Sequence, residues 1–170
     1  ILNFKHGMVP RGVLMDLARY KGVDWLEPGP AIYPEDLEGW EKKAGVKVRS
    51  GDVMIVRTGR WARRDAKGPW AVQQLAGLHM SCAPWMHARD VSILGGDDAP
   101  DVLPSQVEGV SQPIHALCIV AMGMPIFDNL DLELVGREAE KRKRWEFLVT
   151  ASPAAVPGAT GSVLNPIATF

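Results

Sequence analysis

The sequence lacks most of the features that assign a chain to a specialised class of protein. It has no apolar run of about 20 residues, the length that spans a bilayer, and no recognisable secretion signal. Its only two cysteines, Cys82 and Cys118, lie far apart in apolar surroundings, which argues against a disulfide framework or a zinc knuckle. We therefore expect two buried free thiols in a soluble, cytoplasmic protein.

The sequence also lacks an excess of charge of either sign. Nineteen basic residues stand against 20 acidic ones, giving a net charge of -1. This balance gives no electrostatic reason to expect nucleic acid or a membrane surface as a partner. With 170 residues, 46% of them hydrophobic, the chain is long enough for its own core. No repeat or linker divides it, so we expect a single domain over residues 1–170.

Apolar runs and helix signals alternate along the chain. A helix is expected over 34–44, because Pro34 suits a first helical position and Gly45 follows the end. Residues 59–74 are polar and read as a surface excursion, and the tail from Ser152 reads as irregular structure. The remaining strands are predicted at 12–18, 53–58, 91–94, 125–127 and 145–151, and the remaining helices at 81–88, 113–122 and 131–144. This alternation predicts an α/β fold with a partly parallel sheet, in which the apolar helix 113–122 belongs to the core.

Sequence motifs that identify a particular type of reaction are also absent. There is no Gly-x-Ser-x-Gly elbow, no phosphate-binding loop and no His-x-x-His or Cys/His cluster. The four histidines are scattered, at positions 6, 79, 87 and 115. No self-contained metal site can be recognised from the residues alone.

Two residues stand out against this background. His115 opens the apolar helix, where it is either a core histidine bonded to backbone, which the residues alone favour, or faces a cleft. Asp128 follows a strand and forms either an Asx turn, again the favoured reading, or part of a site. Asp97, Asp98 and Asp101 follow another strand, at the end where open α/β sheets bind ligands, although loop solvation explains them equally well.

A series of short sequence blocks, more than composition or periodicity, resembles a known family. The matching blocks occur in order along nearly the whole chain, at residues 11–22, 32–37, 51–59, 76–79, 83–86, 113–116, 121–125, 128–131, 158–162 and 165–167. Together they resemble the C-terminal half of the cyclase family, the metal-dependent hydrolases that include kynurenine formamidase and isatin hydrolase. The family signature His-x-Gly-Thr-His-x-Asp lies upstream of the block at Arg11 and is not in this chain.

The resemblance implies a swivelling β/β/α fold with a mixed sheet, here incomplete at the N-terminus, and zinc or manganese as cofactor. It implies that His115 and Asp128 contribute to the metal site, with Asp standing where the formamidases have Glu. It places His79 near the substrate pocket, and we expect Trp61, Trp85, Met86 and Trp70 as pocket walls. The catalytic residues, among them a histidine acting as general acid and base, are expected upstream of this chain. The assembly implied is a homodimer or homotetramer.

The predicted activity is hydrolysis of an amide, formamide or lactam C–N bond in a small substrate, aromatic ones included, by metal-activated water. Two other readings stay open. The chain is alternatively a non-catalytic fragment or paralogue that keeps the fold for small-molecule binding or assembly, or a cyclase in the literal sense that acts on polyketide-like substrates. The His-x-Gly-Thr-His-x-Asp signature in the parent protein would distinguish the enzyme from the binding protein.

Three structural expectations follow. The helix 113–122 and the strand 125–127 are joined by a short turn, so they should form a hairpin that brings His115 close to Asp128. An incomplete fold should leave apolar residues uncovered, most of all at 13–17. The glycine-rich segment 158–162 should be an irregular loop close to the pocket.

Overall fold

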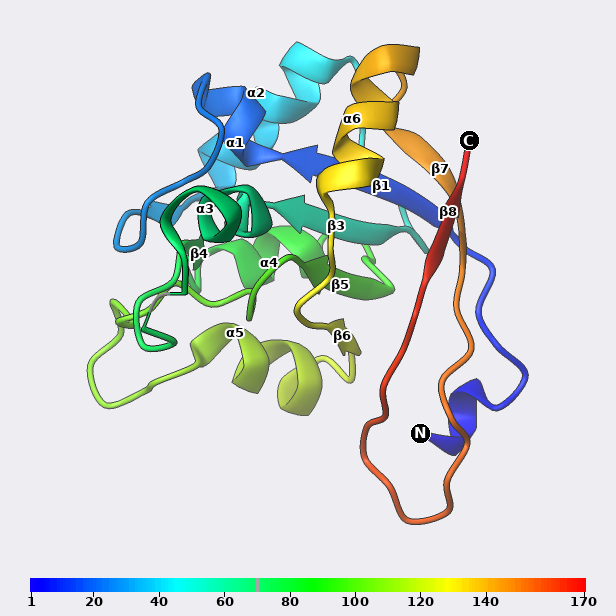
Figure 1. Cartoon of the computed structure of the whole chain (residues 1–170). Helices are drawn as coiled ribbons and strands as arrows, with labels where there is room; N and C mark the ends of the chain where they lie inside the picture. The colour runs from blue at the N-terminus through cyan, green and yellow to red at the C-terminus, as the bar shows by residue number, and fades with distance from the viewer. Residues whose placement is uncertain (70) are drawn as a thin grey trace.

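The computed structural model describes residues 1–69 and 71–170 (Figure 1). Its helices are η1 (Leu2–Phe4), α1 (Leu17–Lys21), α2 (Pro34–Ala44), α3 (Arg60–Lys67), α4 (Cys82–His87), α5 (Pro113–His115), its π-helical continuation η2 (Ala116–Ala121), and α6 (Glu133–Arg142). Its strands are β1 (Arg11–Asp16), β2 (Ala31–Ile32), β3 (Val53–Arg57), β4 (Gly77–Leu78), β5 (Ile93–Gly96), β6 (Ile126–Phe127), β7 (Glu146–Thr150) and β8 (Ile167–Thr169). None of the helices in these ranges is long and apolar enough to cross a membrane.

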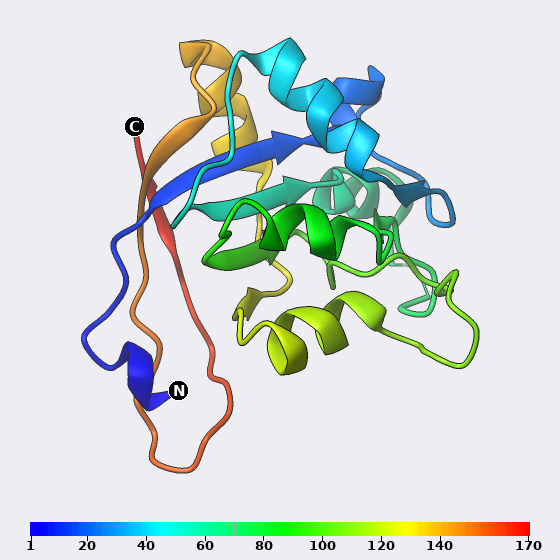
Figure 2. The ribbon, with the colours of Figure 1, turned by 180° about the vertical axis from the view of Figure 1, so that it is seen from behind.

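The main sheet is mixed, as predicted, and has the strand order β6-β5-β3-β1-β7-β8. The first four strands in this order pair in parallel, whereas β7 and β8 run antiparallel. Nearly every residue of β1 and β3 is buried, because helices cover both faces of a parallel sheet. Figures 1 and 2 show α3 and α6 on one face and α2 and α4 on the other.

Parallel pairing delivers the carboxyl ends of β1, β3, β5 and β6 to one edge of the sheet. Polar side chains follow each of these strands, with Asp16 ending β1, Thr58 following β3, Asp97 following β5 and Asp128 following β6. In open α/β sheets this edge is where ligands bind. The fold thus gathers residues that are far apart in the sequence along a single line.

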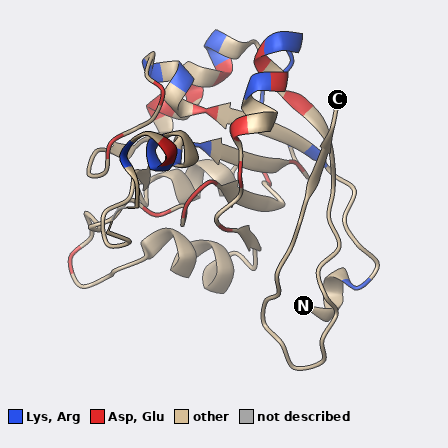
Figure 3. Cartoon of the chain, in the orientation of Figure 1, with Lys and Arg blue, Asp and Glu red and all other residues tan. Residues whose placement is uncertain are grey.

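The two ends of the chain form an arm that projects from the sheet (Figure 1). Met8 pairs with Ala151, and the amino group of Ile1 lies 3.4 Å from the carbonyl oxygen of Ala159. After this excursion the chain returns as β8 along β7. Charged residues are scarce on the arm and on η2, and they concentrate on α1, α2, α3 and α6 (Figure 3).

The structure corrects four expectations. Residues 60–67 form a helix, not an irregular surface excursion, and the tail contains a strand, β8. The helix predicted at 113–122 is only partly in the core, since Ile119 and Val120 are 51% and 83% exposed. The apolar residues at 13–17 are completely buried by this chain, so the prediction of an uncovered face there was wrong.

The sequence did not predict helix α3, because the residue that caps its N-terminus is far away in the sequence. No residue of α3 is buried, and four of its eight residues are Arg or Lys, so the segment has the composition of a solvated surface stretch. The carboxylate of Asp97 accepts hydrogen bonds from the backbone N–H groups of Gly59 and Arg60, at 2.8 and 3.1 Å. These are among the N–H groups that a helix start leaves without an intrahelical partner, and a residue so distant in sequence cannot be recognised as their acceptor.

A buried ion pair ties the sheet to the helices around it. Arg57, at the end of β3, donates to Asp16 at 2.9 Å and to Glu133 at the start of α6 at 2.7 Å. Asp16 is fully buried and also accepts from the backbone N–H of Arg19 in the first turn of α1. The two carboxylates therefore fix β1, β3, α1 and α6 relative to one another through one guanidinium group.

Replacing Asp16 with Ala should lower the free energy of unfolding by about 3–5 kcal/mol, because the change leaves the Arg57 charge buried with one carboxylate fewer. The matched control is Glu138→Ala on α6, which removes exposed pairs with Lys141 and Arg142 and should cost less than about 0.5 kcal/mol. Urea unfolding of both variants measures the difference. Equal losses would show that the buried pair does not hold the elements together.

Candidate functional site

The candidate site is built around His115 at the start of the α5–η2 helix. Asp101 lies in the segment that follows β5, and its carboxylate accepts from the backbone N–H of Ile114 at 2.6 Å and of His115 at 3.2 Å. Asp101 thus satisfies two of the N–H groups that a helix start leaves unpaired. The helix that carries His115 begins where a buried carboxylate holds it.

The His115 ring lies between two carboxylates. Its Nδ1 is 2.6 Å from Oδ2 of Asp101, and its Nε2 is 3.2 Å from Oδ2 of Asp128. The Asp101 side chain is fully buried, that of His115 is 20% exposed, and that of Asp128 is 47% exposed. The predicted approach of His115 to Asp128 is confirmed, and so is an orienting hydrogen bond at the other ring nitrogen.

The approach arises from the tight reversal between η2 and β6. The backbone N–H of Met124 donates to the carbonyl of Cys118 at 2.8 Å, which closes the end of the helix. β6 then pairs in parallel with β5, so that Phe127 lies opposite Gly95. Asp128 is the next residue and comes out at the carboxyl edge of the sheet, beside the beginning of the helix.

The position of Asp101 depends on a glycine in a neighbouring strand. A Cβ atom on Gly77 of β4 would lie 2.4 Å from the backbone carbonyl group of Asp101, a distance that real contacts do not reach. Next to it, Leu78 donates to the carbonyl of Pro100 at 2.7 Å. Gly77 therefore lets the segment that carries Asp101 pack directly on β4.

The loop that carries Asp128 is held in place from the opposite side. Leu130 donates its backbone N–H to the carbonyl of Gly96 at 2.9 Å, and Asn129 adopts a left-handed conformation with φ of 61°. The guanidinium group of Arg60 bonds to the Asn129 side chain and forms an ion pair with Asp98 at 2.9 Å. The loop is therefore tied both to the end of β5 and to α3.

The environment shifts the protonation of several groups in the site. Hydrogen bonds to Asp101, then to Asp128, raise the pKa of His115 to about 9. Burial raises the pKa of Asp98 to about 6, and the nearby carboxylates of Asp97 and Asp128 add to that rise. The metal-free site therefore holds a proton on His115 at neutral pH, as a cationic ring between two carboxylates.

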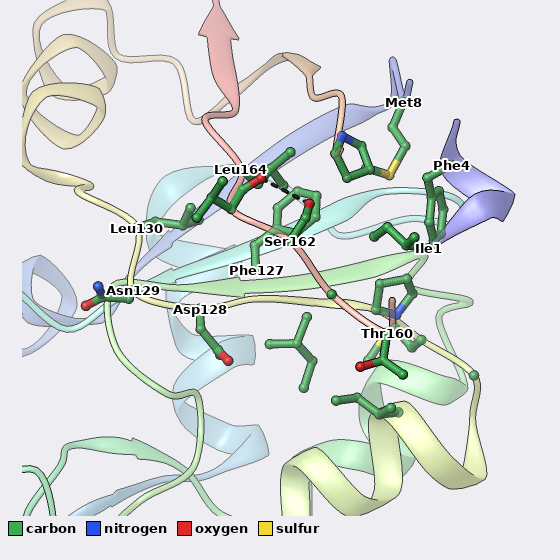
Figure 4. A pocket seen from close by; sticks show the side chains of 18 residues that line it. Ile1, Phe4, Met8, Phe127, Asp128, Asn129, Leu130, Thr160, Ser162 and Leu164 are labelled. Atoms are coloured by element: carbon green, nitrogen blue, oxygen red, sulfur yellow. Dashed lines mark hydrogen bonds between the residues drawn. The ribbon is translucent and has the colours of Figure 1, made fainter. Parts of the chain in front are cut away.

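Two cavities meet at the loop of residues 128–130. The first has a volume of about 630 Å³, and the second, between α6 and the β7–β8 pair, about 740 Å³. Asp128, Asn129, Leu130 and Leu164 line both. Figure 4 shows the first cavity, bordered by the N-terminal segment, by Phe127 and by the C-terminal loop. The prediction that residues 158–162 lie close to a pocket agrees with this lining, which includes residues 160–162.

Trp61, Trp85 and Met86, three of the residues predicted as pocket walls, do not line either of these cavities. Trp85 is buried in α4, where its Nε1 donates to Glu38 at 3.2 Å and the Arg89 guanidinium group stacks over its ring. Met86, its neighbour, is also buried. Trp61 on α3 donates to the carbonyl of Leu130 at 2.8 Å, so it supports a residue that lines both cavities. Neither of the two cavities is lined by these side chains.

Among the described residues, no hydrogen bond joins His79 to His115. It follows β4, where its ring packs on Tyr33 with centroids 4.8 Å apart and its Nδ1 lies 2.9 Å from the hydroxyl oxygen of Ser81. Trp70 lies outside the described residues. The two cysteines are free and buried, as predicted, and burial raises the pKa of each thiol to about 12, which disfavours the nucleophilic thiolate.

Comparisons with known proteins place the chain in a family. The sequence profile of the cyclase family matches residues 4–101, more than half of the chain. The chain belongs to the cyclase family. His115 and Asp128 lie beyond the matched range. No curated protein shows significant similarity to the chain.

Solved structures show the same fold. One described as a novel cyclase is similar with a TM-score of 0.84 and 30% identity, over 99% of this chain and 56% of its own. An isatin hydrolase bound to the product analogue thioisatinate is similar with a TM-score of 0.68 and 14% identity, over 93% and 58%. A potential metal-dependent hydrolase with cyclase activity gives 0.63 and 15%, over 98% and 66%. The chain thus spans little more than half the length of the first two relatives.

Asp101 is the residue that sequence reasoning did not single out. It appeared as one of three acids after a strand, and its solvation in a loop explained it equally well. In the structure it is fully buried and makes three hydrogen bonds, to two backbone groups and the His115 ring. The available signal was its place at the carboxyl edge of a parallel strand, which does not by itself distinguish Asp101 from Asp97 or Asp98.

The raised pKa of His115 predicts how stability depends on pH in the metal-free chain. Because the folded-state pKa of about 9 lies above the ordinary value of 6.5, protonation stabilises the fold. This contribution, at most about 3 kcal/mol, is complete below the unfolded-state pKa and is lost as pH rises through the folded-state pKa. Urea unfolding of the wild type and of His115→Gln should therefore differ most near about pH 6 and least near about pH 10. A difference that stays constant over this range would contradict the assignment.

Proposed function

We propose that this chain provides one side of the metal site and the substrate cavity of a metal-dependent hydrolase that cleaves a C–N bond in an amide, formamide or lactam. The observation that carries the proposal is the pairing of His115 with Asp128 at the carboxyl edge of the sheet, beside a cavity of about 630 Å³. Two of the relatives described above bear names that refer to hydrolysis, one of them to isatin, which is a lactam.

The two side chains fit a divalent cation such as Zn²⁺ or Mn²⁺. An imidazole nitrogen and a carboxylate oxygen are common ligands of both metals. Two ligands bound at about 2.0–2.1 Å around a tetrahedral ion are roughly 3.3 Å apart, and Nε2 of His115 lies 3.2 Å from Oδ2 of Asp128. Across residues 1–69 and 71–170 no three His, Cys, Asp or Glu side chains converge as a complete metal site, so the pair supplies two ligands.

The chemistry expected of the site divides between the cation and this chain. When bound, a divalent cation lowers the pKa of water to about 7 and polarises a carbonyl group. His115 offers Nε2 once its proton has left, and Asp101 holds the ring while this happens. Asp128 offers one carboxylate oxygen, and the anchored loop 128–130 fixes its direction. Burial raises the pKa of Asp98 to about 6, and the nearby charge of Asp128 adds to that rise.

The first cavity suits a small substrate with an apolar body. Its walls are Ile1, Phe4, Met8, Ile119, Met124, Ile126, Phe127 and Leu164, together with polar groups of the loops. Its volume lies within the range of about 300–1,000 Å³ typical of small-molecule sites. Asp128 is the charged side chain on its wall, so the reacting group of the substrate would be directed toward the edge of the sheet.

A second function stays open. The alternative is a binding protein that retains the fold, and within the described ranges no group of three ligands converges. Such a protein would bind small molecules in the cavity without turnover. Measurement of metal binding and of hydrolysis on the same preparation distinguishes the two functions.

The proposal predicts that Zn²⁺ or Mn²⁺ binds when this chain is joined to the His-x-Gly-Thr-His-x-Asp segment expected upstream, and that His115→Ala and Asp128→Ala each weaken this binding by more than about 100-fold, because each removes a direct ligand. Calorimetric titration measures the affinity, and hydrolysis of isatin and of an aryl formamide measures the activity, which should fall in parallel. His87→Ala and Asp131→Ala are the matched controls, since His87 and Asp131 are exposed residues outside the pair.

Unchanged metal affinity in His115→Ala would refute the metal site. Metal and isatin binding without hydrolysis would instead support the binding protein. Unfolding curves of all four variants show whether a loss of binding exceeds any loss of stability.

A further inference from the structure

Asp101 is buried so completely that both of its oxygens must be satisfied by protein groups. Oδ1 accepts from the backbone N–H of Ile114 at 2.6 Å, and Oδ2 accepts from the backbone N–H of His115 at 3.2 Å. Oδ2 also lies 2.6 Å from Nδ1 of the His115 ring. Each of these contacts requires the carboxylate to act as an acceptor, so the ring nitrogen facing it must be the donor.

The two carboxylates beside His115 compete unequally for the ring protons. The contact of Asp101 is 0.6 Å shorter than that of Asp128, at 2.6 against 3.2 Å, and short charge-assisted hydrogen bonds are the stronger ones. Asp101 is fully buried, so loss of the Nδ1 proton would leave a buried carboxylate facing a lone pair. Asp128 is 47% exposed, so water can replace the ring as its partner. When the ring is neutral, the remaining proton therefore stays on Nδ1.

We infer that Asp101 is a positioning residue that keeps the proton of His115 on Nδ1 and directs the lone pair of Nε2 toward Asp128. The inference rests on the proposed function insofar as it makes Nε2 a metal ligand. A carboxylate behind a ligating histidine fixes the tautomer and the ring orientation, and its loss typically weakens metal binding by roughly 10- to 100-fold. The packing of Gly77 against the backbone of Asp101 keeps the carboxylate at this place.

Asparagine cannot replace Asp101 in this role, although it has the same shape. Its single oxygen can serve only one side of the place that the carboxylate occupies. On the side of Ile114 it leaves the amide nitrogen facing Nδ1 of His115 as a donor, and on the side of His115 it holds the Nδ1 proton through a neutral oxygen, which is a weaker acceptor than a carboxylate. In both orientations Asp128 is the carboxylate left beside the ring, so the proton moves to Nε2 and the lone pair directed at Asp128 disappears.

The first arm of the test reads the tautomer directly in the metal-free chain. Long-range proton–nitrogen NMR spectra, recorded at a pH where His115 is neutral, should show Nδ1–H in the wild type and Nε2–H in Asp101→Asn. Asp128→Asn, which alters a partly exposed group and leaves the helix start intact, should keep Nδ1–H. The inference is overturned if the wild type shows Nε2–H, or if Asp128→Asn changes the tautomer whereas Asp101→Asn does not.

The second arm measures zinc affinity by calorimetric titration of this chain joined to the His-x-Gly-Thr-His-x-Asp segment expected upstream, with Asp101→Asn expected to bind roughly 10- to 100-fold more weakly than the wild type. The matched control is Asp97→Asn, which alters another fully buried carboxylate at the same edge, one that bonds to residues 58–60 and not to His115. Its zinc affinity should stay within a few-fold of the wild type at equal folded fraction.

The two arms separate the inference from the proposed function. If zinc binds through His115 and Asp101→Asn binds it as tightly as the wild type, the positioning role is overturned and the metal site stands. If the wild type shows the Nδ1–H tautomer but does not bind zinc even when joined to the signature segment, the metal site is refuted and the positioning role stands. If Asp101→Asn does not fold, the tautomer of His115 in the wild type and in Asp128→Asn decides whether the inference stands.

Discussion

The parallel register of β1, β3, β5 and β6 is the constraint on which the rest of the structure depends. Parallel pairing sends every strand's carboxyl end to one edge, and each of these strands is followed by a polar residue. The paired ends bring Asp16, Asp97 and Asp128 to this edge from three different parts of the chain. With an antiparallel strand in their midst, one of these groups would lie at the opposite edge.

Buried carboxylates at this edge are tolerated because each is surrounded by donors. Asp16 bonds to Arg57 and to the start of α1, Asp97 to the start of α3, and Asp101 to the start of α5. In each case an acid satisfies backbone N–H groups that a helix start leaves without partners. The same device that begins the helices thus sets the charge of the site. Of these three carboxylates, only that of Asp101 also contacts a titratable ring, so the residue that holds the start of α5 also orients the ring of His115.

The sequence predicted the elements with strong local signals. The helix at 34–44 was located correctly, because Pro34 and Gly45 mark its ends, and the buried strands β1 and β3 were recognised from unbroken apolar runs. The contact between His115 and Asp128 was also predictable, since the turn between η2 and β6 is too short to allow any arrangement but a hairpin. Helix α3 and strand β8 were not predictable, because one is capped by Asp97 and the other is held by pairing with β7.

The sequence by itself determined the α/β class, the resemblance to the cyclase family and the pairing of His115 with Asp128. All three rest on local patterns or on residues joined by short connections. Only the tertiary structure decided that Asp101, and not Asp97 or Asp98, lies behind the ring of His115. It also decided that the cavity beside Asp128 is lined by the chain's two ends and not by Trp61 or Trp85. These arrangements join residues far apart in the sequence, and their geometry is set by sheet register and by close packing such as that of Gly77 on Asp101.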